Sequence, residues 1–135
     1  MQTLPHECGR LILALGGILA GLAVAAGAFG AHMLKNVLDP PMLAAYDTAT
    51  RYQMFHALGM VLAGLAMRIY GDRKLAAVGW LFAAGIMLFC GSLYGIALLG
   101  TRWLGPLTPV GGLAFMAGWG VFAWRIWAGS GGKAS

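Results

Sequence analysis

Four long apolar stretches dominate the pattern of hydrophobic and polar positions along the chain. They cover residues 11–31, 52–70, 76–99 and 110–127, and each is continuous rather than alternating. A helix needs roughly 20 predominantly apolar residues to cross a hydrocarbon core about 30 Å thick. Membrane strands would instead alternate apolar and polar residues over about 10 positions. The pattern therefore predicts an all-α protein with four membrane-spanning helices.

The connection between the first two stretches is the only one long enough to form an element of its own. Asp39 followed by Pro40 and Pro41 predicts a helix start, with Asp39 as the N-cap and proline in the first turn. The apolar residues that follow recur on one face. We expect a short interfacial helix over residues 41–50, which can continue into the second span.

The last connection and the C-terminal segment carry similar signals. Thr108 and Pro109 predict an N-cap and a first-turn proline at the start of the fourth span. Residues 128–135 are rich in glycine and serine, which predicts a flexible tail.

Composition agrees with this pattern. The 135 residues are 60% hydrophobic and only 10% charged, whereas an average soluble domain has about a quarter of its residues charged. We therefore interpret residues 1–135 as a single membrane domain, an integral four-helix bundle in contact with the lipid bilayer.

The basic residues are distributed unevenly between the two sides that four spans define. One side has both termini and the second connection, and the other side has the first and third connections. Basic residues on the first side are Arg10, Arg68, Arg73, Lys74, Arg125 and Lys133, against Lys35, Arg51 and Arg102 on the second. The positive-inside rule then predicts that both termini are cytoplasmic. This topology accounts for the net charge of +5, and no basic stripe indicates binding to nucleic acid.

Small residues recur four positions apart in several spans. Such pairs allow helix backbones to approach closely, which favours helix association in lipid. The predicted helix-packing residues are Gly17, Gly21, Gly30, Gly91, Gly95 and Gly118. They fit packing within one bundle or an interface between subunits. A bundle of this size has little interior in which to use all of these faces, so we also expect self-association.

Polar side chains gather at the outer ends of the spans, where every span contributes at least one, whereas the inner half has almost none. The members of this predicted polar cluster are His32, Tyr52, Gln53, His56, Ser92, Tyr94 and Thr108. Buried polar groups must find partners. The cluster is therefore either a small polar pocket open to the outside or a set of contacts that hold the helix ends together.

Specific chemistries find too few partners in this cluster. A zinc site needs three or four ligands, and no carboxylate lies at the depth of His32 and His56, with Cys90 as the only thiol nearby. Axial haem ligation by the two histidines would lack room. Ser92 with His56 lacks the third group of a catalytic triad, and the apolar inner half disfavours a channel. We expect no catalytic residue, cofactor or metal.

Four short motifs lie at residues 27–32 (GAFGAH), 52–58 (YQMFHAL), 91–94 (GSLY) and 105–112 (GPLTPVGG). Together they resemble those of a known family, the YgdD-like small membrane proteins that form domain of unknown function 423. Cys90 departs from the serine or similar small residue expected there. The resemblance covers residues 10–127 and implies a multi-pass protein of the bacterial inner membrane. It implies no reaction, substrate or cofactor.

Two functions from different classes follow. The first is a non-enzymatic membrane protein that acts by association through its glycine-rich faces, as a homo-oligomer or as an accessory subunit of another membrane protein. The alternative is a binder or transporter of a small polar molecule, ion or lipid headgroup, which would use the outer polar cluster. An enzyme ranks third.

Overall fold

The computed structural model describes residues 3–130, and it describes side chains from residue 6 to residue 129. Within this range the chain is helical and has no strand, which confirms the all-α prediction. The helices are α1 (Thr3–His32), α2 (Pro40–Tyr70), α3 (Ala76–Gly85), α4 (Gly91–Leu99) and α5 (Leu107–Ser130). Between them lie the 3₁₀ turns η1 (Leu34–Asn36), η2 (Arg73–Leu75) and η4 (Arg102–Leu104), and the π-helical segment η3 (Ile86–Cys90).

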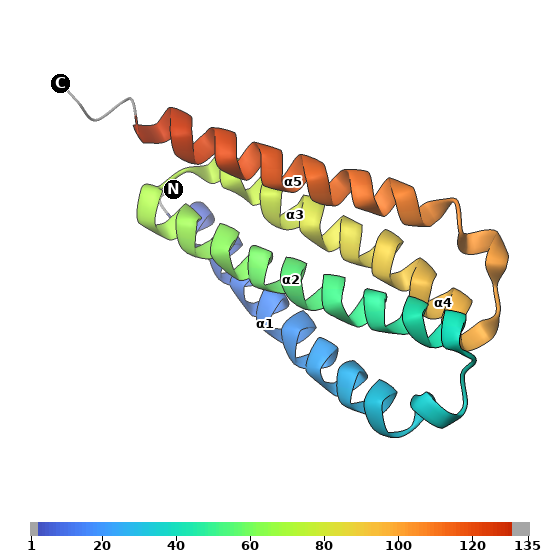
Figure 1. The fold of residues 1–135 in the computed structure, drawn as a ribbon. Coiled ribbons are helices and arrows are strands. Elements are labelled where there is room, and N and C mark those ends of the chain that lie inside the picture. The colour runs from blue at the N-terminus through green and yellow to red at the C-terminus, as the bar shows by residue number, and fades with distance from the viewer. Residues whose placement is uncertain (1–2, 131–135) are drawn as a thin grey trace.

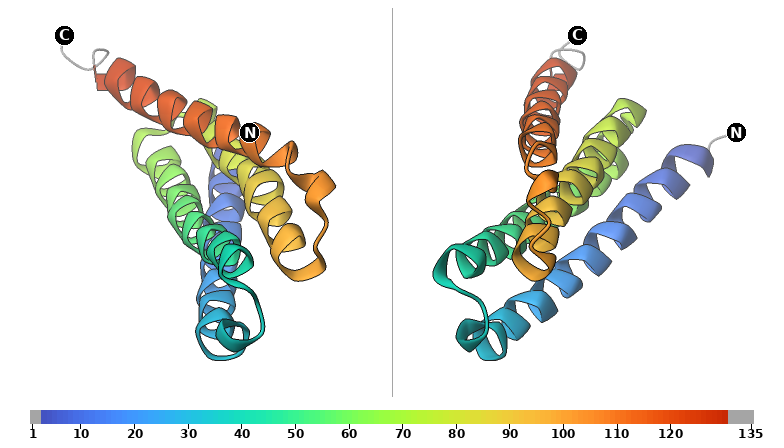
Figure 2. Two further views of the ribbon diagram at one scale, coloured as in Figure 1. Left: turned by 45° about the vertical axis from the view of Figure 1, so that its right-hand side comes forward. Right: turned by 90° about the vertical axis from the view of Figure 1, so that its right-hand side faces the viewer.

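The chain passes along the bundle four times, in alternating directions, as four helical rods (Figure 1). The rods are α1, α2, the continuous segment formed by α3, η3 and α4, and α5. α1 packs along α2, and α5 packs along α3. The helices α1 and α5 therefore lie on opposite sides of the central pair α2 and α3 (Figures 1 and 2). We call the end with η2, the start of α1 and the end of α5 the terminal end, and the end with η1 and η4 the loop end.

Three segments of the described chain are long and apolar enough to cross a membrane: His6–Asn36, Arg73–Leu99 and Arg102–Gly129. They correspond to the first, third and fourth predicted spans. α2 is as long as α1, but it is not among the candidates. Its sequence includes Gln53, His56 and several charged residues, which lower its mean hydropathy. That α2 crosses the membrane stays a prediction.

The segment predicted as an interfacial helix is helical, but it forms the first turns of α2 rather than a separate element. Asp39 caps α2 as predicted, since its Oδ1 accepts a hydrogen bond from the Met42 N–H at 3.0 Å. No glycine or proline occurs between Pro41 and Gly59. Tyr46 and Ala49 on this segment are buried, so packing against the bundle keeps α2 continuous.

Both ends of α5 differ from the prediction. The helix starts at Leu107, so Thr108 lies in its first turn and is not the N-cap. At the other end α5 continues to Ser130, so residues 128–130 of the predicted tail are helical. Residues 131–135 of that tail lie outside the described part of the chain.

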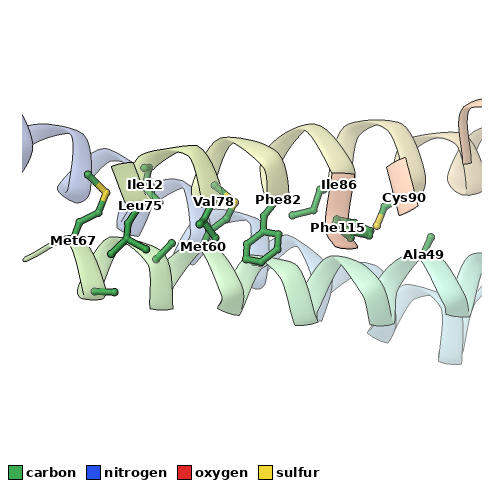
Figure 3. Packing of buried hydrophobic residues seen from close by; sticks show 13 residues of the cluster. Ile12, Ala49, Met60, Met67, Leu75, Val78, Phe82, Ile86, Cys90 and Phe115 are labelled. Carbon is green, nitrogen blue, oxygen red and sulfur yellow. The ribbon is translucent and has the colours of Figure 1, made fainter. Parts of the chain in front are cut away.

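The main core extends along the length of the bundle between α2 and α3 (Figure 3). Its largest fully buried side chains are Phe82, Ile12, Met60, Leu75, Val78 and Cys90. α1 contributes Ile12 and α5 contributes Phe115, so the two outer helices each insert a bulky side chain between the central helices.

Small residues bring α1 and α2 into close contact. On α1 they recur every seven positions, at Gly9, Gly16, Ala23 and Gly30. All four residues are buried. A Cβ added to Gly16 would lie 2.8 Å from the backbone oxygen of Ala57. This distance is too short for any side chain, so the backbones themselves are in contact.

A second close approach lies where α5 crosses η3. A Cβ on Gly111 would overlap the backbone nitrogen of Phe89. Isolated π-helical turns inside α-helices are rare and frequently occur at functional sites. Here the π-helical segment passes directly beneath a glycine of the neighbouring helix, next to the polar residues described below.

The two adjacent glycines of α1 provide a matched test of this packing. Gly16→Leu would place a side chain against the α2 backbone, and overpacking of this kind costs about 1–3 kcal/mol or more. Gly17 has open space around its Cα, so Gly17→Leu should change the free energy of unfolding by less than about 0.5 kcal/mol. Reversible unfolding in mixed micelles measures both values. Equal stabilities of the two variants would contradict the packing of α1 on α2.

Candidate functional site

The polar residues of the predicted cluster form separate joints between helices, and the most central joint is the amide of Gln53. Gln53 is 6% exposed. Its Nε2 donates a hydrogen bond to the backbone oxygen of Leu19 at 2.9 Å. Its Oε1 accepts one from the Tyr94 hydroxyl at 2.7 Å. One side chain on α2 thereby joins α1 and α4.

Tyr46 extends this joint toward the loop end, although the predicted cluster did not include it. Its hydroxyl donates to the backbone oxygen of Ala26 at 2.6 Å. Its ring meets that of Tyr94 edge to face, with centroids 5.4 Å apart. Tyr46 precedes Gln53 by seven residues and so lies on the same face of α2. This spacing could have identified Tyr46 as a member of the cluster from the sequence.

A second joint connects α4 to α5. Ser92 Oγ and Thr108 Oγ1 lie 2.6 Å apart, and Ser92 Oγ also donates to the backbone oxygen of Phe89 at 2.9 Å. A hydroxyl has only one hydrogen. Because the carbonyl oxygen of Phe89 can only accept, Thr108 must donate to Ser92.

His56 occupies an aromatic box rather than a polar pocket. Its Nδ1 lies 2.7 Å from the backbone oxygen of Tyr52, so Nδ1 carries a hydrogen and donates it. The imidazole stacks on the ring of Phe115, with centroids 3.5 Å apart and planes 10° apart. Phe82 meets it edge-on at 5.3 Å, and Trp119 lies 6.1 Å away. These rings come from α3 and α5, and the sequence does not indicate that they face His56.

The two remaining members of the predicted cluster, Tyr52 and His32, are exposed and are not part of these hydrogen-bonded contacts between helices. Tyr52 is 39% exposed, and it contributes its ring, which stacks on Phe89 at 4.8 Å. His32 is exposed at the last residue of α1, and no contact joins it to His56. The structure therefore does not bring the two histidines together in one site.

Nearly all the buried polar atoms of the described side chains have partners, and the exception is Thr101 Oγ1. In the low dielectric of a protein interior, satisfied hydrogen bonds of this kind hold helices in a unique arrangement. No group of three or more His, Cys, Asp or Glu residues suited to a metal ion occurs within the described residues. These hydrogen-bonded polar side chains can therefore fix the positions of the helices relative to one another.

The sequence analysis did not identify one ion pair. At the terminal end, Arg125 on α5 contacts Asp72, with Nε and Nη2 at 2.7 and 2.6 Å from the same Oδ2. Both residues are on the side predicted to be cytoplasmic. Their opposite charges at the same depth could have indicated the ion pair from the sequence.

The six glycines predicted to pack helices divide into two groups. Gly30 packs against the ring of Tyr46, Gly95 against Leu104, and Gly118 against the ring of Phe82. The other three, Gly17, Gly21 and Gly91, have no atom within 4 Å of an added Cβ. The first group serves the bundle, and the second lies on open helix surfaces.

A double-mutant cycle tests the central joint. We expect Gln53→Leu and Tyr94→Phe each to lower the free energy of unfolding by about 1–2 kcal/mol, because each removes a buried hydrogen-bond partner. The double variant should lose less than the sum, with a coupling energy of about 0.5–1.5 kcal/mol. As a control, Tyr94→Phe with Thr108→Val should be additive within about 0.5 kcal/mol. Equal coupling in both pairs would rule out a specific bond.

Comparison with known proteins gives consistent matches. The family model described as protein of unknown function (DUF423) matches residues 26–112. A UPF0382 membrane protein of Staphylococcus saprophyticus is 43% identical over 112 residues, which is 82% of this chain and 91% of the relative. The UPF0382 membrane protein YwdK of Bacillus subtilis is 43% identical over 111 residues, which is 82% of this chain and 90% of the relative. No solved structure matches.

Proposed function

Because this chain belongs to the DUF423 family and is similar to proteins of bacteria that are named membrane proteins, we propose that it acts by association within the membrane. In this proposal it is a non-enzymatic homo-oligomer or an accessory subunit, and all four rods cross the bacterial inner membrane. The basic residues of the terminal end support an orientation with both termini in the cytoplasm.

The observation that carries the proposal is a second small-residue face on α1. Gly17 and Gly21 lie four residues apart, with open space around both. Ala14, Ala25 and Ala28 extend the same face over several turns, and all five residues are exposed. Small residues at this spacing are typical of closely packed helix pairs in lipid.

This face points away from the bundle. The opposite face of α1 is already in contact with α2, and α5 lies on the far side of the central helices (Figure 2). Two bulky residues border the small face, since Ile18 is 59% and Val24 is 62% exposed. A row of small residues between branched side chains can pack closely against the same row of a second copy, related by two-fold symmetry.

The alternative function, binding or transport of a polar ligand through the outer cluster, receives less support. The polar atoms of Gln53, Ser92, Tyr94 and Thr108 are already hydrogen-bonded to one another or to the backbone. A ligand would have to break these bonds. A ligand-induced thermal shift that is lost in a His32→Ala, His56→Ala variant would restore this alternative.

Substitution of the exposed glycines tests the proposed association. We expect Gly17→Leu with Gly21→Leu to weaken self-association in lipid vesicles at least tenfold, because the added side chains hold the helices apart. Single-molecule photobleaching of labelled protein measures the oligomeric state. Gly120→Leu is a matched control, since Gly120 on α5 also has open space around it. An unchanged oligomer in the double variant, with unchanged copurifying membrane proteins, would contradict the proposal.

A further inference from the structure

A cavity of about 480 Å³ opens at the terminal end of the bundle. It lies between the end of α2, the turn that leads into η2 and the last turns of α5. Its walls include Tyr70, Asp72, Leu75, Arg125 and Ile126. The volume is within the range of small-molecule sites. The residues that line the cavity come from the end of α2, the turn into η2 and the end of α5, and Figure 1 shows these segments at the opposite end of the bundle from η1 and η4.

The polar wall of the cavity is the Asp72–Arg125 ion pair, which is only about one-fifth exposed. Both guanidinium bonds go to one oxygen, Asp72 Oδ2. The other oxygen, Oδ1, accepts from the Lys74 N–H. A guanidinium has five N–H donors, so these two bonds leave three donors for another acceptor. Asp72 therefore holds the guanidinium in place without using all of its donors.

The surroundings of the cavity favour an anionic group. Arg68, Arg73 and Lys74 are exposed at the same end, and Asp72 is the one carboxylate in the cavity wall. Guanidinium groups bind phosphate oxygens with planar, directional hydrogen bonds. Basic pockets between membrane helices on the cytoplasmic side are typical sites for anionic lipid headgroups.

The location of the cavity selects a lipid as the source of the phosphate. It lies where the apolar segment that begins at Arg73 and the apolar segment that ends at Gly129 meet charged residues, which is the level of lipid headgroups if these helices cross the bilayer. Tyr70 and Trp124 are more than half exposed at this level, as is typical of residues at the membrane interface. Leu75 and Ile126 provide an apolar wall next to the ion pair.

We propose that this cavity binds the phosphate headgroup of an anionic phospholipid from the adjoining leaflet. The phosphate accepts hydrogen bonds from the free donors of Arg125. The glycerol and the first methylene groups lie against Tyr70 and Ile126. This site is independent of the proposed self-association through α1, because it lies between α2 and α5.

The first test fills the cavity without disturbing the ion pair. Gly129 lines the cavity, and a Cβ added there would meet no atom within 4 Å. Native mass spectrometry of the purified full chain, incubated with phosphatidylglycerol or with phosphatidylcholine of the same acyl chains, measures the bound lipid. We expect the wild-type protein to retain phosphatidylglycerol in preference, and Gly129→Phe to retain at least tenfold less. Gly120→Phe, on the same helix, should bind as the wild type does.

The second test removes the guanidinium. Arg125→Gln alone would leave Asp72 unpaired, so the matched variant is Asp72→Asn with Arg125→Gln, which keeps the net charge. It should lose phosphatidylglycerol as Gly129→Phe does. Arg73→Gln removes an exposed positive charge outside the cavity and should reduce binding less than twofold. An equal loss in the Arg73→Gln variant would show diffuse surface attraction and overturn the site.

Inorganic phosphate distinguishes the two sources of the same chemistry. If the cavity serves a lipid, millimolar phosphate should leave the bound phosphatidylglycerol and the thermal unfolding temperature unchanged. Thermal stabilisation by inorganic phosphate that Gly129→Phe abolishes, without preferential lipid retention, would overturn the lipid proposal. Equal retention of phosphatidylcholine and phosphatidylglycerol by the wild type would also overturn it.

Discussion

The close contact between α1 and α2 is the constraint on which the rest of the structure depends. Glycine at positions 9, 16 and 30 and alanine at position 23 remove the side chains that would otherwise separate the two backbones. Because α1 lies this near, the Gln53 amide can reach the backbone oxygen of Leu19, and the Tyr46 hydroxyl can reach that of Ala26. A wider spacing would leave the Gln53 Nε2 and the Tyr46 hydroxyl without these partners in an apolar environment, which is costly. These two hydrogen bonds to the α1 backbone can therefore form only if the small residues of α1 allow α2 to approach closely.

The same arrangement explains why polar residues occur in such an apolar chain. Each hydrogen-bonded joint connects a different set of helices: Gln53 connects α1, α2 and α4, and Ser92 with Thr108 connects α4 and α5. Apolar contacts in lipid do not discriminate strongly between one rotation of a helix and another, because lipid tails are as apolar as the side chains. Directional hydrogen bonds do. We interpret the polar cluster as the feature that selects one arrangement of the helices, with His56 held among aromatic rings at its edge.

The sequence predicted the helices well and their partners less well. Apolar length located the four rods, and cap chemistry located the start of α2 at Asp39, because both depend on local residues. Hydropathy also placed His32 and His56 at the same end, but depth says nothing about the direction in which a helix face points. His56 faces Phe115 and Phe82, and His32 faces outward. The glycine pairs show the same limit: four-residue spacing identified Gly17 and Gly21 as a packing face, but the bundle uses the seven-residue spacing on the other side of α1. Which face of α1 packs in the bundle depends on the residues of α2, and the sequence of α1 alone does not specify it.

The central claim is that α1 has two small-residue faces, one for α2 and one for a second copy of the chain. Cysteine crosslinking in native membranes tests it most directly, with single cysteines placed along α1 in a Cys8→Ser, Cys90→Ser background. We predict that Gly21→Cys and Ala25→Cys give crosslinked dimers, whereas Ala20→Cys and Ala26→Cys, on the sides of the helix nearer to α2, do not. Crosslinking that is absent at Gly21, or equally efficient at all four positions, would contradict the account.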